Sequence, residues 1–385
     1  MKIIADGNIP FVAECFSSIG EVRVVPGREI MSSVVAEADV LLVRSVTPAG
    51  SDLLAGSKVK FVGTATIGFE HIDVDFLQQQ EIGFASAPGS NANSVAEYIV
   101  AAMLSVASKH KFELEGKSIG IIGVGNVGSL VERKVSTLGM KVYLNDPPLQ
   151  RQSGDPKYLP IENLFDCDFI TLHTPLTFEG IDKTFHLADE KFFKSLKSGC
   201  IFLNTARGGV VDSIALKAAM KSGRLKSVVL DVWENEPNID MELLEMVDIG
   251  TPHIAGYSLD GKVAGTVMVY KAACEYFGLE AKFDIESFLP APAVARLEVN
   301  PKAGGEQDVL RETVEKIYDI KKDDTDLRWL LDKPVGKRGA FFDRLREDYP
   351  VRREFQNTQI LLEAPCEALA RKLAGIGFKE VQSRK

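Results

Sequence analysis

The stretch SIGIIGVGNVGSLVERKVSTLGMKVYLND, residues 118–146, decides the fold of this chain. It opens with an apolar run over 119–122, typical of a buried strand, and breaks at the glycine-rich turn GVGNVG, residues 123–128. A helical pattern follows, and a second strand over 141–144 leads to Asp146. Strand, glycine turn, helix, strand and acidic residue in this order predict a dinucleotide-binding unit.

Each glycine of the turn has a physical role in such a unit. Gly123 permits the tight turn, Gly125 lets a pyrophosphate approach the backbone, and Gly128 lets the helix pack closely on the sheet. The carboxylate of Asp146 is expected to bind ribose hydroxyls and to repel a 2′-phosphate, which favours NAD over NADP. Arg151 lies near enough in sequence to weaken that preference. The alternative is a tight strand-to-helix turn without a ligand.

The composition narrows the class of protein. A chain of 385 residues, 45% hydrophobic and 26% charged, is long enough for two or three ordinary globular domains. Its net charge of -9, without a concentrated Lys/Arg stripe, argues against a nucleic-acid partner. The five cysteines lack CxxC spacing, so neither a disulfide framework nor a metal site is predicted. The sequence shows no signal-peptide core and no membrane-length apolar run, so we expect a cytoplasmic protein without a membrane partner.

Short apolar runs alternate with helix-like segments on both sides of the glycine turn. Such spacing suits parallel strands joined by crossover helices. Before the turn the runs are 2–5, 22–25, 40–43, 61–64 and 83–86; after the nucleotide strand pair they are 169–172, 200–204, 228–231 and 248–250. We therefore predict an α/β protein with two doubly wound parallel-sheet domains, a flavodoxin-like substrate domain and a Rossmann NAD domain.

Helical patterns suggest where these domains begin and end. A helix expected over 94–109, with Ser94 as N-cap and Glu97 completing a capping box, begins the Rossmann domain. A helix over 259–278 is expected to return to the first domain. The predicted domains are a discontinuous substrate domain over 1–92 and 259–285, a NAD-binding domain over 93–258, and a C-terminal domain over 286–385.

The C-terminal residues show a different pattern. Pro290 and Pro292 mark a linker, and no catalytic group of residues stands out beyond them. Helical patterns over 308–320, 339–348 and 365–375 accompany an apolar strand over 358–362. This mixture predicts an α+β assembly domain.

Three reactive side chains each follow one of the last three strands predicted for the NAD-binding domain; they are Arg207, Glu236 and His253. Because the carboxyl ends of parallel strands meet at the crevice that holds the ligand, we expect these side chains to lie close together. The trio suits hydride transfer between NAD and a 2-hydroxy acid. A neutral imidazole accepts the hydroxyl proton, a carboxylate orients that imidazole, and a guanidinium holds the substrate carboxylate.

Six short motifs resemble those of one enzyme family. They are ATIGFEHID (65–73), NANSVAE (91–97), GVGNVG (123–128), NTARGGVVD (204–212), LDVWENEP (230–237) and TPHIAGYS (251–258). On these motifs the chain, over roughly residues 1–285, resembles the D-isomer-specific 2-hydroxyacid dehydrogenases. The resemblance implies an NAD-dependent oxidoreductase whose two α/β domains close over cofactor and substrate at a hinge near Asn93 and Leu259.

The resemblance also implies roles for single residues. His253 is implied as the proton donor and acceptor, with Arg207 and Glu236 as the other active-site residues. Contacts with NAD are implied for Gly123, Gly125, Asn126, Val127, Gly128, Asp146, Thr174, Ala206, Asp231 and Gly256. Contacts with the substrate are implied for Ser45, Thr66 and Tyr257, although Ser45 and Thr66 also suit simple loop caps.

Further features resemble one branch of the family, whose substrate carries a phosphate. These are ADGNIP at 5–10, RSVTPAG at 44–50, Tyr257 after the histidine motif, and the C-terminal extension. In that branch the extension is a dimerisation domain, so we expect a homodimer. Arg44 and Arg346 are candidates to hold the phosphate, although spacing marks neither of them.

Two alternatives remain open at this point. The substrate could be another 2-hydroxy acid, such as 3-phosphoglycerate or glycerate. A corepressor-like protein that senses NAD would keep the same three residues. Among the other polar residues, His173 and His110 are expected to be structural, and Glu234 is expected to be a solvated neighbour of Glu236.

Overall fold

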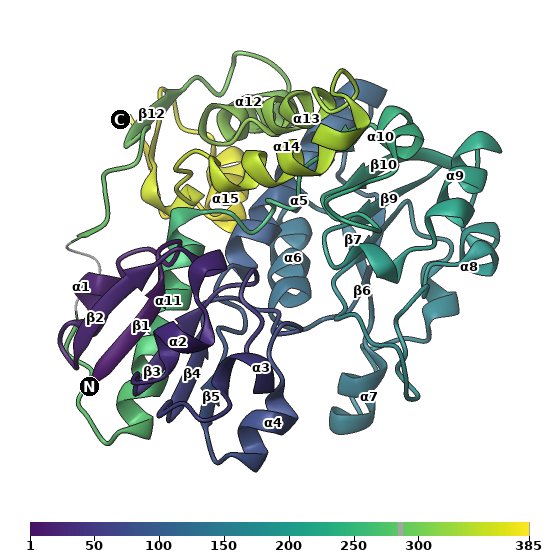
Figure 1. Ribbon diagram of the computed structural model, residues 1–385. Helices are drawn as coiled ribbons and strands as arrows, with labels where there is room; N and C mark the ends of the chain where they lie inside the picture. Colours follow the sequence, from purple (N-terminus) through teal and green to yellow (C-terminus); the bar gives the residue numbers. More distant parts are fainter. Residues whose placement is uncertain (284–287, 385) are drawn as a thin grey trace. The chain divides into compact units, whose positions relative to one another are not determined.

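The computed structural model of the protein describes residues 1–283 and 288–384 (Figure 1). The chain divides into two compact units, Met1–Ala92 with Tyr257–Ala291 and Asn93–Gly256 with Pro292–Lys385. The first unit is therefore discontinuous in sequence, and the residues after Pro292 group with the second unit. The division into three domains stays a prediction, and its boundary between residues 285 and 286 lies outside the described residues.

The first unit contains a five-stranded parallel sheet with the order β2-β1-β3-β4-β5, which is the flavodoxin-like order that the sequence predicted. Its strands are β1 (Lys2–Asp6), β2 (Glu21–Val25), β3 (Val40–Val43), β4 (Phe61–Thr64) and β5 (Gly83–Ala85). Its helices are α1 (Val12–Phe16), α2 (Ser32–Val35), α3 (Ser51–Leu54), α4 (Val74–Gln79) and the returning helix α11 (Leu259–Tyr276), with a short 3-10 turn η1 (Gly27–Glu29).

Both faces of this sheet are covered. Ile3 and Leu42 belong to one buried hydrophobic cluster, whereas the next residues along the strands, Ile4 and Leu41, belong to another. Successive residues of a strand point to opposite faces, so a sheet buried on both sides needs apolar residues at every position. This explains continuous apolar runs such as VLLV in β3.

The second unit contains a six-stranded parallel sheet with the order β11-β10-β9-β8-β6-β7. Its strands are β6 (Ser118–Ile122), β7 (Lys141–Asn145), β8 (Phe169–Leu172), β9 (Cys200–Asn204), β10 (Leu225–Leu230) and β11 (Ile249–Gly250). Its helices are α5 (Ala92–His110), α6 (Asn126–Thr137), α7 (Pro147–Ser153), α8 (Glu190–Ser195), α9 (Ser213–Lys221) and α10 (Met241–Met246), with 3-10 turns η2 (Ile161–Leu164) and η3 (Gly208–Val210). The direction of the strand order reverses between β6 and β8, which is the switch point of a doubly wound fold.

The C-terminal part of the second unit has its own small parallel sheet with the order β12-β13-β14. Its strands are β12 (Arg296–Val299), β13 (Gln359–Leu362) and β14 (Glu380–Ser383). Its helices are α12 (Glu306–Ile317), α13 (Ile320–Arg328), α14 (Val335–Glu347) and α15 (Glu367–Ile376), with the 3-10 turn η5 (Phe355–Asn357). The predicted mixture of helices and strand is confirmed, whereas β12, β14 and α13 were not predicted.

The capping box predicted at Ser94 and Glu97 is wrong. Helix α5 begins earlier, at Ala92, and both side chains are buried. Ser94 Oγ donates to Glu354 Oε1 at 2.8 Å, and Glu97 Oε1 accepts from the backbone N–H of Phe355 at 3.0 Å. These residues were misassigned because their partners lie in the C-terminal segment, which a local sequence pattern does not reveal.

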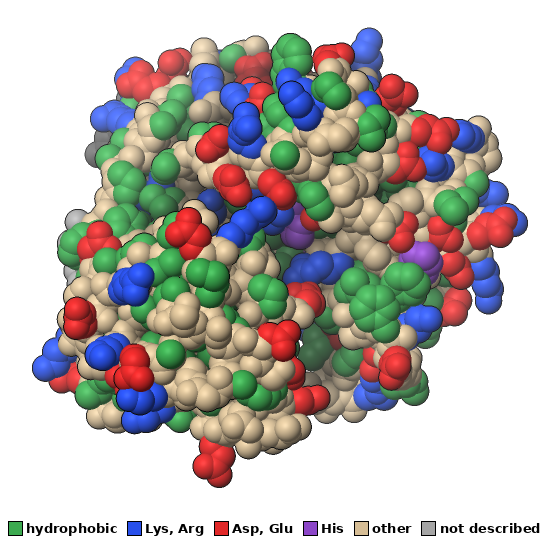
Figure 2. Space-filling model, in the orientation of Figure 1, with side chains coloured by type: hydrophobic (Ala, Val, Ile, Leu, Met, Phe, Trp, Pro, Cys, Tyr) green, Lys and Arg blue, Asp and Glu red, His purple; other side chains and the backbone are tan. Residues whose placement is uncertain are grey.

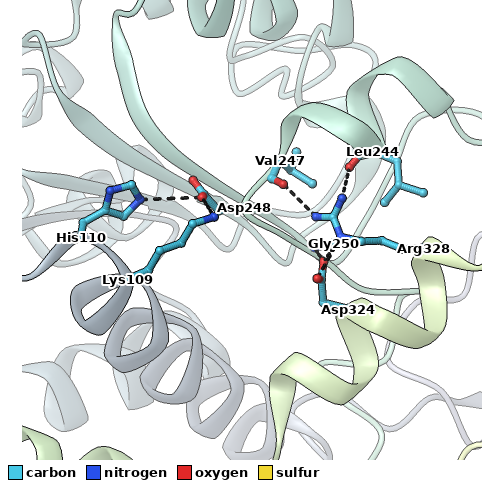
Figure 3. A network of polar contacts seen from close by, with 8 residues as sticks. All are labelled: Lys109, His110, Leu244, Val247, Asp248, Gly250, Asp324 and Arg328. Carbon is cyan, nitrogen blue, oxygen red and sulfur yellow. Dashed lines mark hydrogen bonds and ion pairs between the residues drawn. The ribbon is translucent and has the colours of Figure 1, made fainter.

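Helix α13 docks on the edge of the six-stranded sheet through the contacts shown in Figure 3. Arg328 donates from Nη1 to the carbonyl oxygen of Leu244 at 2.9 Å and from Nη2 to that of Val247 at 2.8 Å. Asp324 accepts from Arg328 Nε and from the backbone N–H of Gly250 at 2.7 Å. One guanidinium therefore pairs with carbonyl groups at the end of α10, and its partner carboxylate pairs with a backbone N–H of the edge strand β11.

Because of the buried carboxyl group of Asp323, in α13, the unfolding free energy should depend on pH. Burial raises the pKa of Asp323 from 3.8 to about 6, although the hydroxyls of Tyr349 and Tyr318 donate to it and Arg352 lies near. The folded protein then holds this proton over a range where the unfolded chain has lost it. The part of the unfolding free energy that depends on this proton is on the order of 3 kcal/mol. It is fully present below about pH 4 and is lost as the pH rises through about 6.

We expect Asp323→Asn to remove this dependence while keeping an acceptor for both tyrosines. The unfolding free energy of the variant minus that of the wild type should rise between pH 4 and pH 6, because only the wild type loses stability there. Urea unfolding at several pH values measures the difference. A difference independent of pH over this range would contradict the assignment.

Acidic and basic side chains are mixed over the face shown in Figure 2, in line with the interspersed charges of the sequence. Within residues 1–283 and 288–384, no helix is both long enough and apolar enough to cross a membrane. The same residues contain no group of three His, Cys, Asp or Glu side chains arranged to hold a metal ion.

Candidate active site

The strands of the second unit end in register along one edge of the sheet. Leu172 pairs with Asn204, Asn204 with Leu230, and Leu230 with Gly250, each at or near the end of its strand. The residues that follow these strands therefore leave the sheet at the same edge. This is the physical reason why side chains so far apart in sequence meet in one place.

The segment after β9 carries Arg207 and is held by the buried Asn204. The Oδ1 atom of Asn204 accepts from the N–H of Ala206, and its Nδ2 donates to the carbonyl oxygen of Arg207, both at 3.0 Å. A single side-chain amide thus closes the turn that presents the guanidinium. Asn204 was not predicted as a site residue; its place as a polar residue at the end of an apolar strand is the signal that marks it.

Gly208 lets this turn lie directly against the backbone after β10. A Cβ at Gly208 would lie 1.9 Å from the carbonyl oxygen of Trp233 and 2.5 Å from the N–H nitrogen of Glu234. Both neighbours are backbone atoms, which cannot turn away as a flexible side chain can. The position therefore requires glycine, and the close approach sets the distance between the Arg207 turn and the segment that leads to Glu236.

Glu236 and His253 form the central pair of the site. The Nδ1 atom of His253 lies 2.8 Å from Glu236 Oε2, and Glu236 Oε1 accepts from the N–H of Trp233 at 2.8 Å. Because a carboxylate only accepts, this contact places the imidazole proton on Nδ1 and leaves Nε2 as the acceptor of a neutral ring. The arrangement suits a group that takes a proton from a substrate hydroxyl.

The charge of Glu236 is stabilised by the site. Burial alone would raise the pKa of Glu236, but His253, the Trp233 N–H and the positive charge of Arg346 together bring it below the ordinary 4.5. The carboxylate is therefore ionised at neutral pH. An ionised partner can both orient the ring and stabilise its charged form once a proton arrives.

The loop that carries His253 is organised around Asp231, the residue that follows β10. Its Oδ1 accepts from Thr251 Oγ1 at 2.6 Å and from the N–H of Ile254 at 2.8 Å, and its Oδ2 accepts from the N–H of Ala255 at 3.0 Å. Its carbonyl oxygen accepts from the N–H of His253 at 2.7 Å. These contacts hold His253 in a left-handed conformation, φ 58°, which a non-glycine residue keeps only when its surroundings enforce it.

The glycine-rich turn has the geometry of a phosphate-binding site. Gly123 has φ 86°, and a Cβ there would lie 2.7 Å from the carbonyl oxygen of His173. A Cβ at Gly128 would lie 2.0 Å from the carbonyl oxygen of Gly123. At Gly125, by contrast, nothing lies within 4 Å of a Cβ position, and no side chain caps the N-terminus of α6. An uncapped helix N-terminus of this kind, which here includes the N–H groups of Asn126 and Val127, suits an anion.

Asp146 connects this turn to the next helix. Its Oδ2 accepts from the N–H of Val124 at 2.8 Å, and its Oδ1 caps α7 by accepting from the N–H of Leu149 at 2.9 Å. The carboxylate thus stands at the end of β7, where a ribose would meet it. Arg151, which was expected to weaken the preference for NAD, forms an ion pair with Asp182.

Thr174 is a further observation that fits a dinucleotide. Its Oγ1 is buried and has no hydrogen-bond partner in the described chain. It follows β8, next to the glycine turn, where a Cβ at Gly123 would lie 3.0 Å from its methyl group. A buried hydroxyl is normally paired, so this atom is suited to a hydrogen bond with a ligand or with water. Ala206 lies on the turn after β9, and Gly256 follows the His253 loop.

His173 is held neutral beside the glycine turn. Its Nε2 lies 3.0 Å from Thr171 Oγ1 and its Nδ1 lies 3.3 Å from Thr205 Oγ1. Burial lowers the pKa of His173 to about 3. A ring whose two nitrogens are both engaged in this way packs the strand ends, in agreement with the structural role expected from the sequence.

The expectation for Glu234 is wrong. Its Oε1 lies 2.8 Å from His186 Nε2, and its Oε2 accepts from the N–H of Ser213 at 2.9 Å, at the start of α9. The residue therefore joins three segments and is not a solvated neighbour. The sequence could not show this because both partners lie more than twenty residues away.

The first unit carries the residues predicted to contact the substrate. Ser45 and Thr66 follow β3 and β4, which pair in register up to Val43 and Thr64. Ser45 is exposed, whereas Thr66 donates to the carbonyl oxygen of Gly68 at 2.8 Å. Thr66 thus shows the contact expected of a loop cap, and its contact with a substrate stays a prediction.

Comparison with known proteins adds to this geometry. Residues 93–255 match the family model described as D-isomer specific 2-hydroxyacid dehydrogenase, NAD binding domain, and residues 288–377 match a domain of unknown function, DUF3410. The erythronate-4-phosphate dehydrogenase of Escherichia fergusonii is 43% identical over 382 residues, which cover 99% of each chain. The chain belongs to the erythronate-4-phosphate dehydrogenases. A further member, from Proteus mirabilis, is 42% identical over 98% of this chain and 99% of its own.

Solved structures place this erythronate-4-phosphate dehydrogenase family member among NAD-dependent enzymes. The NAD+-bound 3-phosphoglycerate dehydrogenase of Entamoeba histolytica is 26% identical, with a TM-score of 0.62, over 74% of this chain and 98% of its own. The D-lactate dehydrogenase of Aquifex aeolicus, solved with NAD and lactic acid, shares the fold at 24% identity and a TM-score of 0.59, over 72% of this chain and 96% of its own. As a member of its family, the chain is an NAD-dependent oxidoreductase that acts on a CH–OH group.

Proposed function

We propose that this enzyme oxidises 4-phospho-D-erythronate to 2-oxo-3-hydroxy-4-phosphobutanoate with NAD, as a step of pyridoxine and pyridoxal 5′-phosphate biosynthesis. The observation that carries the proposal is the Glu236–His253 pair, whose acceptor nitrogen stands at the strand edge that also carries Arg207. The substrate is inferred from the name of relatives that match along nearly the whole chain.

The proposed reaction gives a separate role to each of three side chains. His253 accepts the proton of the C2 hydroxyl at Nε2 as the carbon is oxidised, and returns it in the reverse reaction. Glu236 holds the ring through Nδ1 and stabilises the positive charge that the ring then carries. Arg207 binds the substrate carboxylate through its planar guanidinium, which fixes C2 relative to His253.

Bound NAD supplies the hydride acceptor, the C4 atom of its nicotinamide ring. We propose that the N-terminus of α6 binds the pyrophosphate, that Asp146 binds the ribose hydroxyls and that the Thr174 hydroxyl pairs with the cofactor. The open space at Gly125 and the unpaired Thr174 Oγ1 support this assignment. The remaining contacts proposed for NAD are those of Gly123, Asn126, Val127, Gly128, Ala206, Asp231 and Gly256.

For the substrate we propose contacts with Ser45, Thr66 and Tyr257. Arg44 supports a place for the phosphate next to Ser45, because its Nη1 is buried without a hydrogen-bond partner within the described residues. A guanidinium in this state is suited to a phosphate oxygen. We also propose a cytoplasmic homodimer joined through residues 286–385, which the mass of the intact protein in solution tests.

Asp146→Asn separates the charge of this residue from its structural role. Asparagine also caps a helix, so the contact with Leu149 should be kept, whereas the side-chain NH2 cannot accept from the N–H of Val124 and the melting temperature should fall somewhat. Removing the negative charge should shift the ratio of kcat/KM for NADP over NAD by about tenfold or more toward NADP, because a repulsion of about 1.4 kcal/mol between two close negative charges already amounts to a factor of ten. An unchanged ratio would show that Asp146 does not face the 2′ position.

The substrate is tested by following NADH formation from NAD and 4-phosphoerythronate, with 3-phosphoglycerate and glycerate in parallel and a 2-oxo acid present to reoxidise NADH. Preferred turnover of 4-phosphoerythronate would support the proposal. Preference for 3-phosphoglycerate or glycerate would keep the mechanism and overturn the substrate. No turnover on any of them, with NAD bound, would favour a protein that senses NAD.

A further inference from the structure

The loop that carries His253 receives one contact from far along the chain. Arg352, in the segment between α14 and η5, donates from Nη2 to the carbonyl oxygen of Ala255 at 2.9 Å. Asp231 already binds the N–H groups of His253, Ile254 and Ala255, so it fixes the donor side of this loop. Arg352, in contrast, binds a carbonyl oxygen of the loop, that of Ala255, two residues beyond the histidine.

The surroundings of Arg352 favour a specific role for its charge. Its side chain is only 7% exposed, and its guanidinium lies 4.2 Å from the ring centre of Tyr318. Its Nε and Nη1 have no hydrogen-bond partner in the described part of the chain, although Glu97 and Asp323 lie near enough to interact with its charge. Burying a guanidinium with unpaired donors is unfavourable, and an apolar side chain would fill the space more favourably.

A second contact reaches the other end of the same loop. The hydroxyl of Tyr98, in α5, lies 2.8 Å from Thr251 Oγ1, which in turn donates to Asp231. The rings of Tyr98 and Tyr318 lie 6.3 Å apart, so this tyrosine belongs to the same buried group as Arg352. The backbone of His253 is thus bracketed by a contact at Thr251 and a contact at Ala255.

We propose that Arg352 is a positioning residue of the active site: its bond to Ala255 fixes the backbone after His253 and so directs the imidazole toward Glu236. This inference rests on the proposed role of His253. The C-terminal segment then has a part in the chemistry besides any role in assembly. His253 needs such support because its left-handed backbone would relax if the loop were released.

Arg328 provides a matched control. It also lies in the C-terminal part and also donates to backbone carbonyls, but its acceptors are Leu244 and Val247, before β11 (Figure 3). Arg328→Met therefore removes a docking contact of the same chemistry without touching the carbonyl of Ala255. Comparing it with Arg352→Met separates loss of docking from loss of positioning.

The experiment measures kcat, KM, NADH affinity and melting temperature for the wild type, Arg352→Met, Arg352→Lys and Arg328→Met. We expect Arg352→Met to lower kcat by about 10- to 100-fold with KM and the Kd for NADH changed less than about threefold, since a small misplacement of a catalytic group acts mainly on kcat. Arg352→Lys, which keeps one donor within reach of Ala255, should recover part of the loss. Arg328→Met should lower the melting temperature and keep kcat within about twofold.

A second measurement does not depend on turnover. In the protein without substrate, the Nδ1 proton of His253, assigned by its loss in His253→Gln, should give an NMR signal of a strong hydrogen bond to Glu236. We expect Arg352→Met to shift or broaden this signal and Arg328→Met to leave it in place. If the wild type turns over none of the acids tested, the proposed substrate fails while this measurement still decides the role of Arg352.

The proposal is overturned if folded Arg352→Met keeps both the wild-type kcat and the His253 signal. It is also overturned if Arg328→Met loses kcat to the same extent, since docking alone would then explain the effect. Should Arg352→Met not fold, Arg352→Gln decides, because its side chain is two atoms too short to keep the bond to Ala255: a wild-type kcat and an unshifted His253 signal in that variant would again refute the proposal.

Discussion

Replacing His253 by alanine is expected to lower kcat by about 10²–10⁴-fold, the usual effect of losing a general base, while NAD remains bound. The structure gives the reason: Nε2 of His253 is the acceptor left over when Nδ1 binds Glu236. In alanine no atom replaces it, whereas the glycine turn that we propose to bind the cofactor is untouched. Steady-state kinetics with 4-phosphoerythronate and calorimetric titration with NADH measure the two effects separately.

The pH dependence of the same reaction gives a second test of the role of His253. A protonated imidazole cannot accept the hydroxyl proton, so the wild-type oxidation rate should depend on pH in a way that the residual rate of His253→Ala does not. His110 is the matched control, since it also faces a carboxylate, Asp248, at 3.7 Å (Figure 3). Turnover by His253→Ala near that of His110→Asn would refute the assignment.

Gly208→Ala is expected to reduce kcat/KM by about 100-fold or more, although it adds one methyl group. That methyl group would lie 1.9 Å from the carbonyl oxygen of Trp233, so the backbone on one side must move. Either movement separates the turn of Arg207 from the segment of Glu236. A displacement of about 1 Å at a catalytic group is enough to cost about 100-fold in rate.

Gly209 allows a matched comparison with this change. A Cβ at Gly209 would meet only side-chain atoms of Leu176 and Phe185, at 3.3 Å or more, and these can shift. We therefore expect Gly209→Ala to keep kcat/KM within about fivefold, in the range of ordinary surface and packing changes. Equal activity of the two variants, both folded, would show that the contact between the Arg207 turn and Trp233 does not set the site.

The sequence predicted the parts of the fold whose signal is local. Strands β3, β4, β8 and β9 were placed at their observed bounds because both faces of each sheet are buried, which forces continuous apolar runs. The glycine turn was recognisable for a similar reason, since Gly123 and Gly128 each meet a local steric demand. Arg207, Glu236 and His253 stood out as reactive residues directly after buried strands.

The sequence could not reveal what depends on distant partners. In the C-terminal sheet β13 lies between β12 and β14, so only β13 is apolar enough to be predicted; the outer strands, RLEV and EVQS, are largely exposed. Helix α13, IKKDDTDLR, hides its few buried residues among charges. Arg352 carries no local mark at all, because its acceptor lies 97 residues earlier in the chain.

The contacts of helix α5 have a consequence for how the protein is made. Ser94 and Glu97 lie in its first turns, yet the groups that bind them, Glu354 Oε1 and the N–H of Phe355, come 260 and 258 residues later. A ribosome releases the chain from the N-terminus at about 5–20 residues per second, so these two side chains wait for at least ten seconds or so before their C-terminal partners exist. During translation the helix must therefore keep polar groups at its start in water, and its final packing follows only after residues 354 and 355 have been synthesised.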